Sequence, residues 1–192
     1  AMKMVSAAKL KKAQDAITAM RPYADKLTEL LQNLSGTLEG DSGSSFAEQR
    51  EVNKVLVVAI TSNRGLAGAF NSNIVKACKE LKETTYSGKE VSFMTIGKKG
   101  NDILSKTENI VDFNSDIFDD LTFDNGAVIA QQLMDIFTEG QFDQIVLVYN
   151  KFKNAATQIV MHEQFLPIQQ AESDAENGSG VAVDYIFEPS KE

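Results

Sequence analysis

The feature that most constrains the fold is a helical heptad pattern that runs from Met2 to about Leu34 without a glycine. Apolar residues recur seven apart in two series offset by three, which is the a and d pattern of a coiled coil. The predicted seam consists of Leu10, Ala13, Ile17, Met20, Ala24, Leu27, Leu31 and Leu34. At about 1.5 Å per residue the helix would be roughly 50 Å long, against a mean of about 11 to 12 residues in globular proteins.

The alternative is an amphipathic helix that lies along its own domain, which is the common arrangement for shorter helices. A compact domain within 192 residues cannot cover so long a stripe. Pro22 removes one backbone donor, yet the heptad register continues past it, so a bend rather than a break is expected. The pattern therefore predicts a coiled-coil helix whose seam needs a second helix.

Charge is uneven along the chain, whose formal net charge is -8. An acidic balance argues against general nucleic-acid binding. The basic residues Lys3, Lys9, Lys11 and Lys12 all precede the first acidic residue, Asp15. This basic end predicts an acidic partner at that point.

Cys78 is the only cysteine, so no intramolecular disulfide can form and a reducing compartment is expected. No apolar run approaches the roughly 20 residues that cross a bilayer, and no signal peptide is visible. Direct membrane insertion is therefore not predicted. Residues 1–10 resemble helix interior, and Pro189 suits the first turn of a new helix, so we expect a fragment that lacks a long C-terminal helix.

Residues after the first helix alternate between strand and helix patterns. Strands are predicted at 54–60, 91–96, 109–113, 144–150 and 157–165, and helices from 71 or 72 onward, at 98–106 and at 124–138. This order predicts an α/β fold, with a Rossmann-like, mostly parallel sheet and an antiparallel edge strand. The expected divisions are a coiled-coil helix (1–35), a linker (36–50), the α/β domain (51–188) and the start of another helix (189–192).

Periodicity within the predicted helices indicates which side chains point into the core. The inward residues are expected to be Ile74, Cys78, Leu81, Val128, Leu133 and Phe137. Asn71 or Ser72 is expected to cap the first domain helix. Residues 169–180 are predicted to be an acidic, mobile loop.

The stretch "AITSNRGLAGAFNSNIVKAC" resembles a nucleotide-binding loop at first sight. However, no lysine follows Gly68, as a P-loop requires, and Asn63 and Phe70 stand where the dinucleotide fingerprint needs glycine. Arg64 could still meet an anion beside the helix N-terminus. We interpret Gly65 and Gly68 as a strand-to-helix turn in which glycine allows tight backbone packing.

Other candidate sites are weaker. "IGKKG" is a turn with solvated lysines, and His162 lies on the polar face of a strand. The five aspartates lack EF-hand spacing and are expected in a solvated loop; they are Asp112, Asp116, Asp119, Asp120 and Asp124. No catalytic constellation, cofactor site or metal site is predicted.

The segments "AMKMVSAAKLKKAQ", "RPYA", "TSNRGLAGAFNSNI", "IGKKG", "NKF" and "FEP" occur in an order that resembles the gamma subunits of F-type ATP synthases. The resemblance implies an antiparallel coiled coil inside the ring of alpha and beta subunits, with the α/β domain near the epsilon subunit and the membrane c-ring. It further implies a non-catalytic rotor that couples proton flow to ATP synthesis or hydrolysis. Placement at the cytoplasmic face of the bacterial membrane follows from the same resemblance.

By this resemblance Met2 and Lys3 lie against acidic loops of the beta subunits, and Lys9, Lys11 and Lys12 extend that basic surface. The glycine-turn residues Arg64, Gly65, Gly68 and Asn71 match the family's loop. Asn63 stands where aspartate is frequent, and Ala67 where cysteine is frequent, so no thiol chemistry carries over. Two alternatives remain: a small phosphate- or nucleotide-binding α/β protein, and a coiled-coil adaptor unrelated to ATP synthase.

Overall fold

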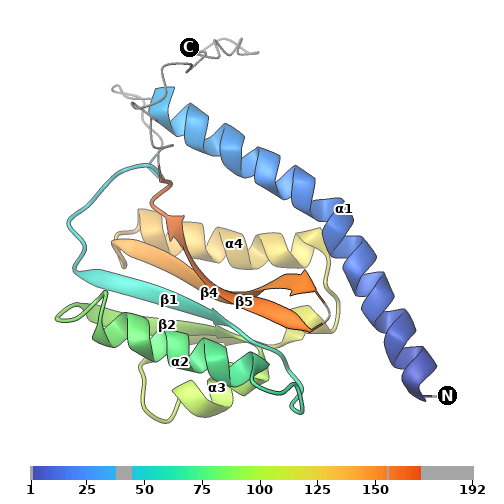
Figure 1. The fold of residues 1–192 in the computed structure, drawn as a ribbon. Coiled ribbons are helices and arrows are strands. Elements are labelled where there is room, and N and C mark those ends of the chain that lie inside the picture. The colour runs from blue at the N-terminus through green and yellow to red at the C-terminus, as the bar shows by residue number, and fades with distance from the viewer. Residues whose placement is uncertain (1, 38–44, 155, 170–192) are drawn as a thin grey trace.

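The structure, a computed structural model, describes residues 2–37, 45–154 and 156–169 (Figure 1). Five strands form one sheet in the order β3-β2-β1-β4-β5, in which only the β4–β5 pair is antiparallel. The strands are β1 (Lys54–Ile60), β2 (Glu90–Ile96), β3 (Ile110–Asn114), β4 (Gln144–Asn154) and β5 (Thr157–Leu166). The helices are α1 (Met2–Thr37), α2 (Phe70–Glu83), α3 (Lys98–Leu104), the 3-10 turn η1 (Asp116–Phe118) and α4 (Phe123–Thr138). The predicted Rossmann-like fold is confirmed.

The central strand β1 is buried because helices cover both faces of the sheet. Its residues Val55, Val57 and Ala59 pack in a core with α2, whereas Leu56 and Val58 pack in a second core with α4. An uninterrupted apolar run is the expected sequence for a strand covered on both faces. The run "VLVVA" thus corresponds to the centre of the domain.

Helix α2 presents the predicted face to the sheet, with Ile74, Cys78 and Leu81 buried. Helix α4 differs from the prediction by one residue. Val128 is 68% exposed, and Ile129 is buried instead together with Leu133 and Phe137. Successive helical residues are about 100° apart, so the spacing of four that joins the three buried residues excludes Val128 from the stripe.

The predicted linker is shorter than expected, because α1 continues to Thr37 and the chain packs on the domain before β1 begins. Residues 38–44 lie outside the described residues. Beyond them, Phe46 packs against the α4-side core, and Arg50 Nη1 donates a 2.9 Å hydrogen bond to the carbonyl oxygen of Phe137. The Arg50 guanidinium also lies 4.6 Å from the centre of the Phe137 ring. Most of the acidic loop predicted at 169–180, and Pro189, are not described.

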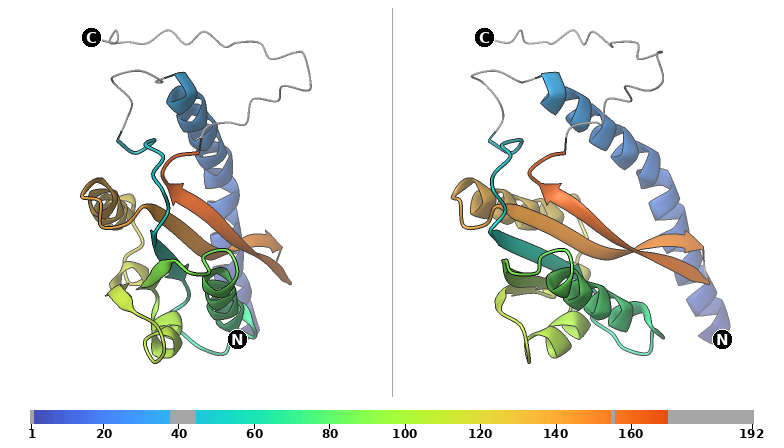
Figure 2. Two further views of the ribbon diagram at one scale, coloured as in Figure 1. Left: turned by 90° about the vertical axis from the view of Figure 1, so that its left-hand side faces the viewer. Right: turned by 60° about the vertical axis from the view of Figure 1, so that its left-hand side comes forward.

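Helix α1 is 36 residues long and continues through Pro22. Figure 1 shows it changing direction near its middle, as expected where proline removes a backbone hydrogen bond. Figure 2 shows the N-terminal part of the helix extending away from the strands. The α/β domain therefore leaves much of α1 uncovered.

Candidate interaction surfaces

The predicted coiled-coil seam lies on the surface of α1. Its large side chains are Leu10 (44% exposed), Ile17 (37%), Met20 (67%), Leu27 (42%) and Leu31 (52%). Ala13 and Ala24 are exposed as well, and the side chain of Leu34 is not described. Apolar side chains that repeat at heptad spacing on an uncovered helix face are typical of a surface that packs against another helix. Pairing of this seam stays a prediction.

At the edge of this seam α1 contacts the domain, because Arg21 lies one helical turn from Ile17 and Ala24. Arg21 Nη2 donates a 2.8 Å hydrogen bond to the carbonyl oxygen of Phe152 on β4. Nearby, Tyr149 donates a 2.8 Å hydrogen bond to Glu163 Oε2 on β5. Burial, that hydrogen bond, and the negative charges of Glu163 and Asp25 raise the pKa of Tyr149 to about 12. Asp25 belongs to α1, and its charge acts on Tyr149 because the helix lies beside the β4–β5 hairpin.

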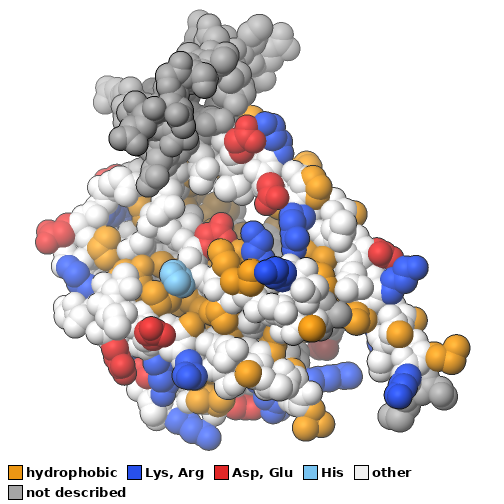
Figure 3. Space-filling view, viewed as in Figure 1, with side chains coloured by type: hydrophobic (Ala, Val, Ile, Leu, Met, Phe, Trp, Pro, Cys, Tyr) orange, Lys and Arg blue, Asp and Glu red, His pale blue; other side chains and the backbone are white. Residues whose placement is uncertain are grey.

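The basic end of α1 is exposed at each of its described lysines, Lys3, Lys9, Lys11 and Lys12. Within the described ranges, the ion pairs involve none of these four side chains. Met2 begins the helix, but its side chain is not described. Figure 3 shows basic and hydrophobic side chains along the projecting part of the helix. The lysines are thus positioned to meet an acidic partner, which remains a prediction.

The glycine turn connects β1 to α2 at the carboxyl edge of the sheet. Leu66 and Gly68 adopt positive φ angles of 59° and 56°, and Leu66 is fully exposed. Arg64 is exposed, whereas Asn71 Oδ1 accepts a 2.9 Å hydrogen bond from the backbone N–H of Ser62. The turn therefore presents Arg64 and Leu66 outward on a backbone that Asn71 holds in place.

Two expectations about this turn are wrong. The residue that caps α2 is Ala69, with no side-chain hydrogen bond, because the Asn71 side chain reaches back to Ser62 instead. Close backbone packing is also not found at Gly68, where an added Cβ would meet nothing within 4 Å. Gly65 leaves room as well, since the nearest atom would be Lys99 Cε at 3.7 Å.

Close packing occurs instead at "IGKKG", which the sequence analysis interpreted only as a turn. Gly97 has a φ of 100°, and a Cβ there would clash with the carbonyl oxygen of Thr61. A Cβ at Gly100 would lie 2.8 Å from Thr61 Oγ1, which accepts a 2.8 Å hydrogen bond from the Gly100 N–H. A Gly-x-x-Gly spacing directly after a strand was the signal that could have revealed this contact.

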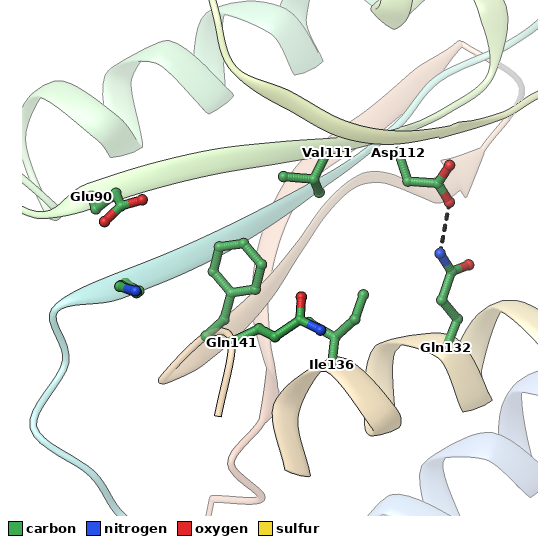
Figure 4. Close-up of a pocket in the computed structure, with 8 residues that line it drawn as sticks. Glu90, Val111, Asp112, Gln132, Ile136 and Gln141 are labelled. Atoms are coloured by element: carbon green, nitrogen blue, oxygen red, sulfur yellow. Dashed lines mark hydrogen bonds between the residues drawn. The ribbon is translucent and has the colours of Figure 1, made fainter. Parts of the chain in front are cut away.

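A hollow of about 320 Å³ lies between α4 and the amino-terminal half of the sheet (Figure 4). Gln132 Nε2 donates a 2.8 Å hydrogen bond to Asp112 Oδ2 at one end, and Glu90 lies at the other. Val111 and Ile136 line it between these ends. The Asp112 carboxylate and the Gln132 amide are paired with each other, and the lining residues include no hydroxyl, thiol or imidazole side chain that could serve as a nucleophile beside Glu90.

Cys78 and His162 lie where the residue patterns placed them, whereas Asp112 is half-buried on β3 and does not lie in the predicted solvated loop. Cys78 is completely buried, and that burial, together with the charge of Glu108, raises its pKa to about 12. Such a thiol is a core residue rather than a nucleophile. His162 is exposed on β5. Asp112 lies on β3, and the other four aspartates lie on or beside η1 and at the start of α4.

The described residues contain neither a metal-binding cluster nor a membrane-spanning helix. No group of three or more histidine, cysteine, aspartate or glutamate side chains there could hold a metal ion. No helix in the same residues is both long enough and apolar enough to span a bilayer.

Fold and surface together define a class of protein: a Rossmann-like α/β domain that carries a long, largely uncovered amphipathic helix suited to assembly with other chains. Comparison with known proteins agrees with that class. A family model described as ATP synthase matches residues 1–192. The chain is 65% identical over 192 residues to the ATP synthase gamma chain of Flavobacterium psychrophilum, covering all of this chain and 66% of that relative. It is 46% identical over 197 residues to the gamma chain of Cytophaga hutchinsonii, covering all of this chain and 67% of that one.

Solved structures agree as well. The central stalk and c-ring structure of the Tetrahymena thermophila mitochondrial ATP synthase matches with a TM-score of 0.62 at 28% identity, covering 86% of this chain and 70% of that chain. A rotor structure of the Euglena gracilis mitochondrial ATP synthase has a TM-score of 0.59 at 21% identity, covering 84% and 55%, and shows the shared fold.

The chain belongs to the ATP synthase gamma chain family. It spans 65% to 66% of the length of the first three curated relatives that it matches.

Proposed function

We propose that this chain serves as part of the rotor in the central stalk of an F-type ATP synthase, coupling transmembrane proton flow to ATP synthesis or hydrolysis. Its relatives at 65% and 46% identity are ATP synthase gamma chains. The observation that carries the proposal is the exposed heptad stripe of α1, which the domain leaves uncovered along a 36-residue helix. A rotor shaft needs such a helix because its contact surface must extend well beyond the domain that turns it.

In this role α1 is one strand of an antiparallel coiled coil inside a ring of alpha and beta subunits. The α/β domain lies below that ring, near the epsilon subunit and the c-ring. The catalytic sites are on the beta subunits, and the coiled coil contributes contacts that differ among the conformations of these three sites. Such differential contacts bias which conformation each site adopts. The chain itself is then a non-catalytic subunit.

Two surfaces of the chain contact the ring in this proposal. The first is the basic end of α1, at Met2, Lys3, Lys9, Lys11 and Lys12, which faces acidic loops of the beta subunits. The described lysines there are exposed and form no ion pairs with the described residues, which leaves them available to a partner. Many weak charge contacts suit a rotating helix pair, because no single rotational position is then bound much more strongly than the others.

The second surface is the glycine turn, with Arg64, Gly65, Gly68 and Asn71. Its outward Arg64 and Leu66 support a contact near the base of the ring rather than a nucleotide site. The whole subunit is expected to be a peripheral part of the complex at the cytoplasmic face of the bacterial membrane.

A chimera tests the proposal. This chain would replace the matching 192 residues of the Flavobacterium psychrophilum gamma chain, and the product would be assembled with that organism's alpha and beta subunits. We expect ATP hydrolysis comparable to that of the parent assembly, because the two chains are 65% identical over the exchanged residues. Failure to assemble, while the parent gamma chain assembles in the same preparation, would contradict the proposal.

The phosphate- or nucleotide-binding alternative is tested on the chain directly. A ligand that binds only the folded state raises the unfolding temperature by mass action. Millimolar ATP, ADP or NAD is expected to leave the unfolding temperature unchanged. A rise that is lost in Arg64→Met would instead support an anion site at the glycine turn.

A further inference from the structure

Charge is segregated within the α/β domain. Residues 107–150 contain nine of the chain's 27 acidic residues and none of its 19 basic residues. Four of the nine gather on η1 and the start of α4: Asp116, Asp119, Asp120 and Asp124. Across the described residues, the ion pairs include none of these four carboxylates. Their charges therefore add to a single-sign field at this corner of the domain.

The same corner exposes large apolar side chains. Phe118 is 40% exposed, Leu121 73%, Phe123 88% and Val128 68%. Aspartates at a helix N-terminus stabilise the helix dipole, which gives Asp120 and Asp124 a local role. That role does not account for the aromatic and aliphatic side chains between them. Large apolar side chains exposed beside polar groups are typical of a protein-binding surface.

The backbone under these side chains is fixed by local hydrogen bonds. Asn125 Nδ2 donates to the carbonyl oxygen of Asp120 at 2.8 Å, and Thr122 Oγ1 accepts from the Asn125 N–H at 3.3 Å. Asn63 Nδ2 donates to the carbonyl oxygen of Ser115 at 2.8 Å, which ties η1 to the glycine turn. A partner would thus meet a formed surface and would not need to order a loop first.

We propose that this η1–α4 surface binds a basic amphipathic segment of a partner protein. The surface consists of Phe118, Leu121, Phe123 and Val128 with Asp116, Asp119, Asp120 and Asp124. Apolar side chains of the segment cover the exposed aromatic and aliphatic groups, and its lysines or arginines pair with the carboxylates. The complementary charge selects a basic partner, because an acidic one would be repelled. The surface is on the α/β domain and is separate from α1, so the inference does not rest on the rotor role of that helix.

Binding of a defined probe tests this inference. The probe is a fluorescent helical peptide of leucine and lysine, with a leucine and glutamate peptide as its negative counterpart, measured by anisotropy at two salt concentrations. The test variant replaces the four aspartates of the surface by asparagine. The matched control replaces Glu51, Glu80, Glu83 and Glu90 by glutamine, which removes the same charge from exposed positions elsewhere.

We expect the four-aspartate variant and the double variant Leu121→Ser with Phe123→Ser each to bind the basic peptide about tenfold more weakly, while the control stays within about twofold of the unchanged chain. Urea unfolding verifies that all variants fold, and exposed positions should change stability little. Equal weakening in both four-site variants would overturn the inference, since the peptide would then respond only to net charge. Sedimentation that shows self-association, abolished by the same four-aspartate variant, would also overturn it by assigning the surface to a second copy.

Discussion

Arg21 and Phe152 lie 131 residues apart in sequence and are joined by a 2.8 Å hydrogen bond from the guanidinium to the backbone carbonyl oxygen. This contact ties α1 to the β4–β5 hairpin at the edge of the heptad stripe, next to Ile17 and Ala24. The large side chains of the stripe stay exposed beside this contact and are accessible to another helix. This hydrogen bond thus attaches α1 to the α/β domain, which in the proposed function would turn together with it.

Replacing Arg21 by methionine should loosen this attachment. A half-buried hydrogen bond from a charged donor is worth about 1 kcal/mol, or roughly a fivefold change in the local opening equilibrium. Hydrogen exchange of the backbone amides in the middle of α1 should accelerate by about that factor. Arg64→Met, on the exposed glycine turn, serves as the control and should leave α1 exchange unchanged. Equal exchange in the two variants would mean that the hydrogen bond does not hold the helix.

Gly97→Ala should be much more damaging than Gly140→Ala. Both glycines have positive φ, at 100° and 72°, but a Cβ at Gly97 would clash with Thr61, whereas one at Gly140 meets nothing within 4 Å. We expect a loss of about 1 kcal/mol at Gly140 from backbone strain alone and at least about 3 kcal/mol at Gly97. Urea unfolding measures both. Similar losses would show that Thr61 does not pack tightly against the second strand's end.

Two adjacent residues of α4 should respond oppositely to truncation. Ile129 is 6% exposed and Val128 is 68% exposed. Ile129→Ala should cost about 2 to 4 kcal/mol through lost burial and a cavity, and Val128→Ala should change stability by no more than about 0.5 kcal/mol. Thermal or urea unfolding of the pair decides the facing of the helix. The reverse order would instead support the inward position predicted for Val128 in the sequence analysis.

Cys78 should contribute a pH-dependent share of stability. Burial raises the pKa of its thiol from 9.0 to about 12, so the unfolded chain loses this proton first as pH rises. The contribution is therefore complete below about pH 9 and declines toward pH 12, by about 1.4 kcal/mol per pH unit. The stability difference between the unchanged chain and Cys78→Ala should shrink accordingly above pH 9. A constant difference across that range would contradict a buried neutral thiol.

Much of the fold could be predicted from the sequence. A strand that is covered on both faces has a continuous apolar run, and a helix that is covered on one face has apolar residues at helical spacing. The strand "KVLVVAI" and the helix face of Ile74, Cys78 and Leu81 are examples. The inward position on α4 was assigned to Val128 although Ile129, its equally apolar neighbour, is the residue spaced four from Leu133, as Phe137 is on the other side.

The candidate interaction surfaces could likewise be predicted from the sequence only in part. Exposure of the heptad stripe agrees with a pattern that no compact domain could cover. The role of the glycines was assigned to the wrong loop, because the approach of Thr61 to Gly97 and Gly100 depends on contacts between different strands. Likewise Asn71 was expected to cap α2, but its side-chain oxygen instead accepts a hydrogen bond from the backbone N–H of Ser62. Long-range contacts of this kind leave little trace in local sequence.

The rotor proposal is tested most directly by watching the chain turn. In the chimeric gamma chain, Lys106→Cys on the exposed surface after α3 would carry a bead, since buried Cys78 should not react with the linker. With alpha and beta subunits fixed to glass and ATP supplied, the account predicts bead rotation in one direction in steps that depend on ATP. ATP hydrolysis by the same assembled particles without any rotation of the bead would contradict it.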